Sequence, residues 1–213
     1  MRPLPLLLSA LLAAACAAVT SDRTGVVVLE SQDYACGAEE GLGCGLRLAP
    51  LLADLDQVDG VVESRTSWDG RMLELWLAPG ADPERVARDA AAVVGGNSLR
   101  VDAAAREGVE RWFDSAQTVD LSRHEAGVLA ARFSAELAAE AGVDPATASQ
   151  VEEILREELT LAFERAHAAG GGLERLWPEV AAARATFEPR VAPLLSEEQR
   201  ARLGAYLDRA LSG

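Results

Sequence analysis

The sequence predicts an α+β protein in which a small unit of mixed strands and helices precedes an all-α helical hairpin or bundle. Short β-branched runs alternate with helical segments over residues 25–102. From Asp102 onward, glycine and strand signals recede and apolar residues recur at helical spacing. An apolar fraction of 49% is sufficient for hydrophobic cores in both units.

The first unit begins with a strand and an amphipathic helix. Residues 25–30 (G-V-V-V-L-E) are short and β-branched, which is typical of a buried strand. Residues 45–55 have helical periodicity, and Pro50 is expected to weaken or bend this helix. Its predicted apolar face is formed by leucines, namely Leu48, Leu51, Leu52 and Leu55.

A β-hairpin is predicted next. Residues 60–67 and 71–77 form its strands, and Asp69-Gly70 between them is a dipeptide typical of tight hairpin turns. The side chains of the second strand alternate between Met72, Glu74 and Trp76 on one face and leucines on the other.

A second helix and a last strand complete the unit. Asp82 is the predicted N-cap and Pro83 the first helical residue, and Gly95-Gly96 ends the helix. Residues 98–101 are a short strand. The resulting β-α-β-β-α-β order predicts a ferredoxin-like fold over residues 25–102.

Two segments of this unit resemble the heavy-metal-associated domain family. Those domains carry a G-M-x-C-x-x-C loop before the first helix and a short P-G-V turn before the second strand. Here the corresponding segments are Gly41-Leu42-Gly43-Cys44-Gly45-Leu46-Arg47 and Val58-Asp59-Gly60-Val61-Val62. Cys44 matches the first metal cysteine of the family, but Arg47 stands at the second and cannot ligate a metal. The resemblance therefore implies a degenerate member of that fold.

Cys36, in an enlarged loop eight residues before Cys44, offers a second sulfur. Two thiolates at this position would suit a soft ion such as Cu(I), Zn(II) or Hg(II). In an oxidising compartment a Cys36–Cys44 disulfide that fastens the loop is the leading alternative. Unpaired or redox-active thiols are the third.

The remainder of the chain is predicted to be helical. Residues 103–119 form an amphipathic helical connector carrying Trp112 and Phe113, and residues 120–213 form the hairpin or bundle. The second long helix starts at Asp144-Pro145, whereas Pro178 and Pro189 are expected to restart or bend the third.

Two segments of the helical region share the pattern L-S-x-x-[EQ], Leu121 to Glu125 and Leu195 to Gln199. Each is predicted to be a capping box, in which the serine and the residue three positions later satisfy each other's amides. The pair also resembles the L-T-x-x-Q motifs of the Spy/CpxP family of periplasmic stress proteins. That resemblance implies a helical hairpin that binds unfolded chains or senses envelope damage and metals, although this chain is acidic where those chaperones are basic.

The first fifteen residues have the pattern of a secretory signal: Arg2, a short leucine-rich run and then Ala13-Ala14-Ala15. Because Cys16 follows directly, the segment resembles the lipobox of bacterial lipoproteins, which implies lipidation of Cys16 and an anchor in the outer membrane. Residues 16–24 would then be a linker. The alternative is cleavage after Ala17 or Ala18 and a soluble secreted protein.

Charge and motif content narrow the function. The chain has 34 acidic and 20 basic residues, all of the latter arginine, and a net charge of −14, which argues against nucleic acid as a partner. No nucleophile elbow, Walker loop, H-E-x-x-H or dinucleotide fingerprint occurs, so no enzyme is expected. Glu164 and His167, three residues apart on one helix, are expected to lie on a solvated face rather than to hold a metal. Three glutamate pairs, at 152–153, 157–158 and 197–198, are expected to face solvent as well.

We therefore expect an exported, non-catalytic lipoprotein of the cell envelope that binds or senses a soft metal ion, or acts in envelope stress or metal resistance. The alternative is a protein-interaction or chaperone-like scaffold, with partner contacts made by the helical region and a structural Cys36–Cys44 disulfide in place of a metal.

Overall fold

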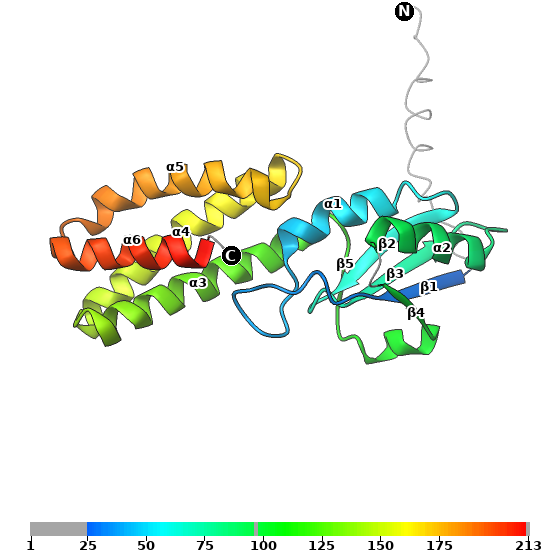
Figure 1. Cartoon of the computed structure of the whole chain (residues 1–213), viewed down its shortest axis with the longest axis horizontal. Coiled ribbons are helices and arrows are strands. Elements are labelled where there is room, and N and C mark those ends of the chain that lie inside the picture. Colours follow the sequence, from blue (N-terminus) through cyan, green and yellow to red (C-terminus); the bar gives the residue numbers. More distant parts are fainter. Residues whose placement is uncertain (1–24, 96–97, 212–213) are drawn as a thin grey trace, which may run out of the picture.

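The computed structural model describes residues 25–95 and 98–211, and it has an α+β fold: an antiparallel sheet with its helices, followed by a helical region. The two parts lie side by side along the long axis of the molecule (Figure 1). The predicted leader, Cys16 and the linker lie outside the described residues.

The sheet has five strands in the order β4-β1-β3-β2-β5, and every neighbouring pair is antiparallel. The central pair is β1 with β3, in a register that places Gly25 opposite Leu77 and Glu30 opposite Met72. The first four strands confirm the predicted ones to within a residue: β1 (Gly25–Glu30), β2 (Val61–Ser67), β3 (Met72–Leu77) and β4 (Leu99–Val101).

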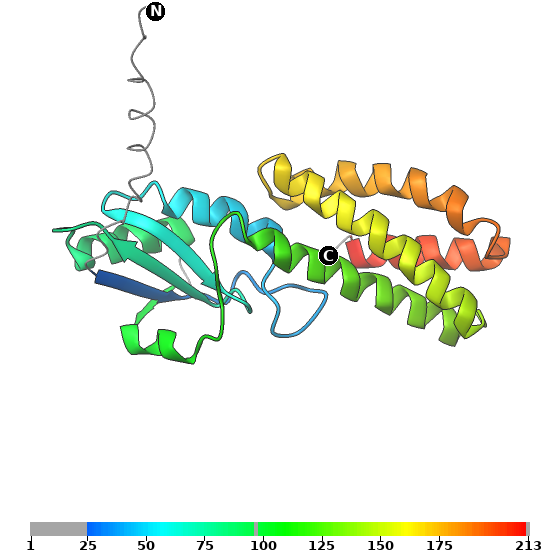
Figure 2. The ribbon, with the colours of Figure 1, turned by 180° about the vertical axis from the view of Figure 1, so that it is seen from behind.

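Two helices, α1 (Gly45–Leu55) and α2 (Pro83–Val94), cover one face of this sheet. The leucines of β3 that alternate with Glu74 are fully buried on that face. A 3₁₀ helix, η1 (Ala103–Gly108), lies on the opposite side (Figure 2). As expected, α2 is capped by Asp82, whose carboxylate accepts a hydrogen bond of 3.0 Å from the amide of Glu84.

Among the described residues the helical region has four helices. They run back and forth beside one another (Figure 1). Asp144 caps the second of them as predicted. The third is a single helix that contains both Pro178 and Pro189, so neither proline restarts it. The four are α3 (Thr118–Glu140), α4 (Pro145–Ala168), α5 (Leu173–Val191) and α6 (Glu197–Leu211).

The predicted helical connector over residues 103–119 is wrong beyond its first half. After η1, Trp112 and Phe113 form a short strand, β5 (Trp112–Phe113), which pairs with Ser67 and Thr66 at the edge of β2. Phe113 is completely buried there. Pairing with the free edge of β2 and burial of the Phe113 ring stabilise a strand here more than the amphipathic pattern stabilises a helix. The local sequence carries no information about that edge.

One of the two predicted capping boxes is also wrong. Ser122 lies inside α3, which begins four residues earlier, so its hydroxyl has no free helix amide to accept from. The reciprocal pair before α3 is Asp114 with Gln117: the amide of Asp114 donates to Oε1 of Gln117 at 3.1 Å, and the amide of Gln117 donates to Oδ1 of Asp114 at 2.8 Å. The second predicted box is confirmed, because Ser196 and Gln199 make the same exchange at 2.9 and 3.3 Å.

One glutamate of the three pairs expected in solvent is buried. Glu158 of α4 lies under α5, where its carboxylate accepts a hydrogen bond of 2.6 Å from the guanidinium of Arg190. Its neighbour Glu157 binds the other nitrogen of the same guanidinium at 2.7 Å. A buried carboxylate requires such a partner, and the partner comes from another helix, which the local sequence does not specify.

Candidate functional site

The loop that joins β1 to α1 carries both candidate cysteines. Ala35 and Gly43 form an isolated antiparallel bridge across this loop. The amide of Cys36 donates to the carbonyl of Leu42 at 2.6 Å, and the amide of Cys44 donates to the carbonyl of Tyr34 at 2.8 Å. Both thiols are buried, Cys36 with 9% and Cys44 with 5% of its surface exposed.

This bridge places the two thiols on the same face. Cys36 follows Ala35 and Cys44 follows Gly43 in the chain, and residues at these positions of a regular antiparallel pair are diagonal neighbours on one face. Diagonal positions have Cα atoms about 7–8 Å apart, slightly more than the ~4.4–6.8 Å of a disulfide. In the structure both residues are free thiols.

Glu125, on α3, is a third member of this site. The thiol of Cys36 donates a hydrogen bond to its carboxylate. The other carboxylate oxygen, Oε2, is buried and has no hydrogen-bond partner among the described residues. Sequence reasoning assigned Glu125 to a capping box, since nothing in the local sequence indicates that α3 packs against the cysteine loop.

Burial raises the pKa of all three groups, and the charge of Glu125 adds to the effect at the two thiols. Desolvation, followed by the negative charge of Glu125, raises the pKa of Cys36 to about 12 and that of Cys44 to about 11. Desolvation also raises the pKa of Glu125, which the hydrogen bond from Cys36 partly offsets. The two thiols are therefore poor nucleophiles at neutral pH, which argues against thiol catalysis.

Nearby hydrogen-bond donors partly offset the rise in pKa at each sulfur. The amide of Ala38 donates to Sγ of Cys36 at 3.2 Å. Cys44 is the N-cap of α1, and the amides of Arg47 and Leu46 in the first turn lower its pKa. Arg47, the residue at the position of the family's second metal cysteine, is an exposed cation that lowers the pKa of Cys44 through its charge. A thiolate formed at Cys44 would thus have stabilising partners already in place.

The loop is fastened to its surroundings at several points. His124 of α3 and Glu39 are joined at 2.7 Å, and His124 also packs edge-on against Trp68. A Cβ on Gly43 would lie 2.7 Å from the amide nitrogen of Gly70, so only glycine permits this approach to the β2–β3 turn. The cysteines therefore occupy a loop with a defined position.

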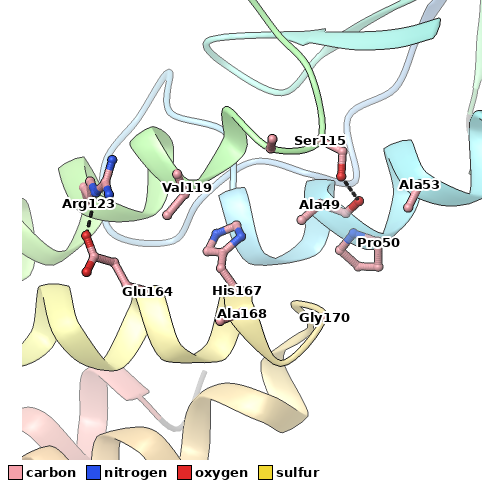
Figure 3. A pocket seen from close by; sticks show the side chains of 11 residues that line it. Ala49, Pro50, Ala53, Ser115, Val119, Arg123, Glu164, His167, Ala168 and Gly170 are labelled. Atoms are coloured by element: carbon pink, nitrogen blue, oxygen red, sulfur yellow. Dashed lines mark hydrogen bonds and ion pairs between the residues drawn. The ribbon is translucent and has the colours of Figure 1, made fainter.

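The second pair considered from the sequence, Glu164 and His167, lies at a separate hollow between α1, α3 and α4 (Figure 3). Glu164 accepts a hydrogen bond of 2.7 Å from Arg123, so its carboxylate is already paired. Nε2 of His167 is hydrogen-bonded to Oγ of Ser122 at 2.8 Å. Burial, then the charge of Arg123, lowers the pKa of His167 to about 4. His167 is thus a neutral, half-buried link between α3 and α4 rather than part of a solvated face.

Within residues 25–95 and 98–211 no group of three or more histidine, cysteine, aspartate or glutamate residues is arranged to hold a metal ion. None of the described helices is long and apolar enough to span a membrane. No family model, curated protein or solved structure matches the chain.

Proposed function

We propose that this chain is an exported, non-catalytic protein that binds one soft metal ion through the thiolates of Cys36 and Cys44. The observation that carries the proposal is the placement of both sulfurs on one face of the Ala35–Gly43 bridge, beside the unpartnered oxygen of Glu125. A cation bound by the two thiolates would replace the thiol protons and offset the negative charge of Glu125, which raises the pKa of both cysteines.

Cu(I) is the ion that this donor set suits best. Thiolate is a soft ligand, and two thiolates are sufficient to coordinate Cu(I). Zn(II) prefers four ligands, and among the described residues no group of three or more histidine, cysteine, aspartate or glutamate side chains is arranged to hold a metal ion, so Glu125 does not act as a third ligand. Diagonal cysteines also lie at a spacing that a metal between two sulfurs bridges more easily than a direct S–S bond does.

The fold of residues 25–102 supports the same proposal. Within the described residues, the first six elements run β-α-β-β-α-β, the sequence of elements of a ferredoxin-like fold, and four of the five strands belong to this segment. We propose that this part is a ferredoxin-like domain of the heavy-metal-associated type, extended at one edge by β5. Cys36 would replace the family's second cysteine, whose position Arg47 occupies.

The cellular location and the biological role that we propose are based on the leader sequence and on the helical region. The leader supports export, and Cys16 supports a lipid anchor in the outer membrane facing the periplasm. The capping box at Ser196 supports the Spy/CpxP resemblance, and a role in envelope stress or metal resistance accords with both.

Metal binding at this site must be coupled to proton release, because each sulfur ligates as a thiolate. The raised thiol pKa values mean that protons compete with the metal across the whole neutral range. Affinity for Cu(I) should therefore rise with pH.

The experiment is a Cu(I) titration against a competing chromogenic chelator under reducing, anaerobic conditions. Two variants are compared. The first carries Cys16→Ser, which leaves Cys36 and Cys44 as its only cysteines, and the second carries Cys36→Ser and Cys44→Ser in addition. We expect one Cu(I) per chain in the first and none in the second. Equal copper uptake by both proteins would refute the proposed site.

The alternative function is a protein-interaction scaffold with a structural Cys36–Cys44 disulfide. One observation favours it: the large apolar side chains of Leu173 and Trp177 on α5 have 40% and 41% of their surfaces exposed. Intact mass of the protein purified from its export compartment, with and without reductant, separates the two. A two-dalton gain on reduction supports the scaffold, whereas a mass shift equal to a bound metal supports the first proposal.

A further inference from the structure

Two adjoining hollows lie beside α5 and α6, which run next to each other in the helical region (Figure 1). The first, of about 470 Å³, is lined by the cysteine loop and by side chains of α1, α3, α4, α5 and α6. The second, of about 460 Å³, lies between α5 and α6. Trp177 belongs to the wall of both, so the two hollows meet at this side chain. Each volume is within the ~300–1,000 Å³ of sites for small molecules.

The second hollow is an unfilled apolar seam. It arises because α5 packs mainly against α4 and α6 packs against α3, so α5 and α6 do not close against each other. Three large apolar side chains line it, namely Val180, Phe187 and Leu207. Its charged side chains, Arg184 and Asp208, are already joined at 2.9 Å. Since Trp177 at the junction keeps 41% of its surface exposed, this seam has the character of a binding surface.

The first hollow carries positive charge, although the chain as a whole has a net charge of −14. Among its lining residues, Arg132 of α3 and Arg209 of α6 lie close together, because both face the carboxylate of Glu136, at 3.4 and 3.7 Å. These distances exceed the ~2.7–3.2 Å of an N–H···O hydrogen bond. Two guanidinium groups thus share one carboxylate without a hydrogen bond to it, and their N–H groups can bind a further anion.

We propose that the two hollows together bind a free fatty acid. Its carboxylate binds Arg132 and Arg209 in the first hollow, and its alkyl chain passes Trp177 into the seam between α5 and α6. A guanidinium pair beside one hollow and an apolar wall in the next require a ligand that has an anionic head and an apolar chain. A long-chain alcohol would leave the guanidinium groups without an anion, and a cationic amphiphile would be repelled by them.

This inference does not depend on the proposed metal site. Cys44 and Glu125 also line the first hollow, but neither is assigned a contact with the ligand. Oε2 of Glu125 is buried, and the other oxygen of this carboxylate accepts from Cys36. Because the binding test is made with a metal chelator present, failure of metal binding leaves the fatty-acid proposal intact, and the reverse also holds.

The experiment is isothermal titration of the full chain carrying Cys16→Ser with laurate, below the concentration at which laurate forms micelles. Cys16→Ser removes the predicted lipidation site, so the chain brings no acyl group of its own. We expect saturable binding of laurate and about tenfold weaker binding of decanoate, which has two methylenes fewer. Dodecanol, which lacks the charge, should bind at least about tenfold more weakly than laurate. No binding of laurate, or equal affinity for dodecanol, would overturn the proposal.

The double variant Arg132→Gln/Arg209→Gln tests the contact with the head. It should weaken laurate binding at least about tenfold and leave dodecanol binding as it is, since only the charged head meets the guanidinium groups. Arg175→Gln, which removes an exposed charge of α5 outside both hollows, is the matched control and should leave both affinities unchanged. Unaltered laurate affinity in the double variant would refute the assignment of the head.

The variant Ala181→Glu tests the contact with the alkyl chain. Ala181 is exposed on α5 and lines the second hollow, so a carboxylate there should weaken the binding of laurate and of dodecanol at least about tenfold. Ala182→Glu, at the next exposed position but outside both hollows, should leave both affinities unchanged. Equal effects of these two variants would contradict the placement of the chain, and far-ultraviolet circular dichroism verifies that each variant is folded.

Tryptophan fluorescence locates the ligand independently. Laurate should change the emission of the unmodified chain, because Trp177 lies where the two hollows meet. The variant Trp177→Phe should abolish this change. A change of the same size in Trp177→Phe would show that the fatty acid binds elsewhere.

Discussion

The backbone amide of Gly172 donates a hydrogen bond of 2.7 Å to the carbonyl oxygen of Leu46. In an uninterrupted helix that carbonyl would accept from residue 50, but residue 50 is proline and has no amide hydrogen. The loop between α4 and α5 thus fills the gap that Pro50 leaves in α1. Because Cys44 is the N-cap of this helix, the bond links the helical region to the element that positions the candidate site.

Gly172→Ala should weaken this link. Gly172 has a φ of +89° and a ψ of 146°, a conformation that only glycine adopts without strain. We expect the free energy of unfolding to fall by about 1–3 kcal/mol. Urea denaturation measures this free energy. Gly127→Ala, inside α3 with no close neighbour, is the contrasting variant and should raise stability by about 0.5–1 kcal/mol. Equal effects of the two variants would contradict the role assigned to Gly172.

Gly45→Ala tests how closely α1 approaches α3. A Cβ at Gly45 would lie 2.3 Å from the carbonyl oxygen of Thr118 and 2.5 Å from Oγ of Ser122, so the helices would have to separate. We expect a loss of at least ~2 kcal/mol in unfolding free energy. Thiol labelling of Cys44 should also become faster, because its helix moves. Gly37→Ala, which meets no atom within 4 Å, should change neither quantity.

The raised pKa values of Cys36 and Cys44 predict the pH dependence of their alkylation. Only the thiolate reacts, so the rate should rise about tenfold per pH unit from pH 7 and continue to rise beyond pH 10, where an ordinary thiol has levelled off. Glu125→Gln removes the charge that opposes ionisation, so it should accelerate alkylation at a given pH.

Mass spectrometry of iodoacetamide-treated protein gives both rates. Glu40→Gln, an exposed change in the same loop, is the control and should leave them as they are. A plateau below pH 9 in the unmodified chain would show that the thiols are not held protonated.

His167 should make the protein less stable in mild acid. Its pKa is lowered to about 4 in the folded chain, whereas an exposed histidine has a pKa of about 6.5, so the unfolded state binds the extra proton first. Stability contributed by the neutral ring is complete above pH 6.5 and is lost as the pH falls from 6.5 towards 4. Because the ring is partly exposed, we expect a loss of roughly 1–2 kcal/mol.

The free energy of unfolding, measured by urea denaturation at pH 7 and at pH 5 in the unmodified chain and in His167→Gln, isolates this contribution. Glutamine preserves a polar partner for Ser122 but does not titrate, so the variant should show a smaller loss between the two pH values. An identical loss in both proteins would assign the acid sensitivity to other groups.

The local elements of the sheet-containing part were predictable from the sequence because their signals are local. A short run of β-branched residues marks β1, Asp69-Gly70 marks the hairpin turn, and Asp82-Pro83 marks the start of α2. Each depends on backbone preferences of a few adjacent residues, which the surroundings reinforce here. The capping box at Ser196 belongs to the same class.

What the sequence determined by itself, then, is the α+β class, the element boundaries of residues 25–102 and the two cysteines as candidates. The tertiary structure decided what those cysteines face: α3 brings Glu125 to Cys36, and β2 turns Trp112 and Phe113 into a strand. It also decided that Glu158 is buried against Arg190 and that His167 meets Ser122. These outcomes depend on contacts between residues distant in the chain, and local propensity and periodicity carry no information about which distant groups meet.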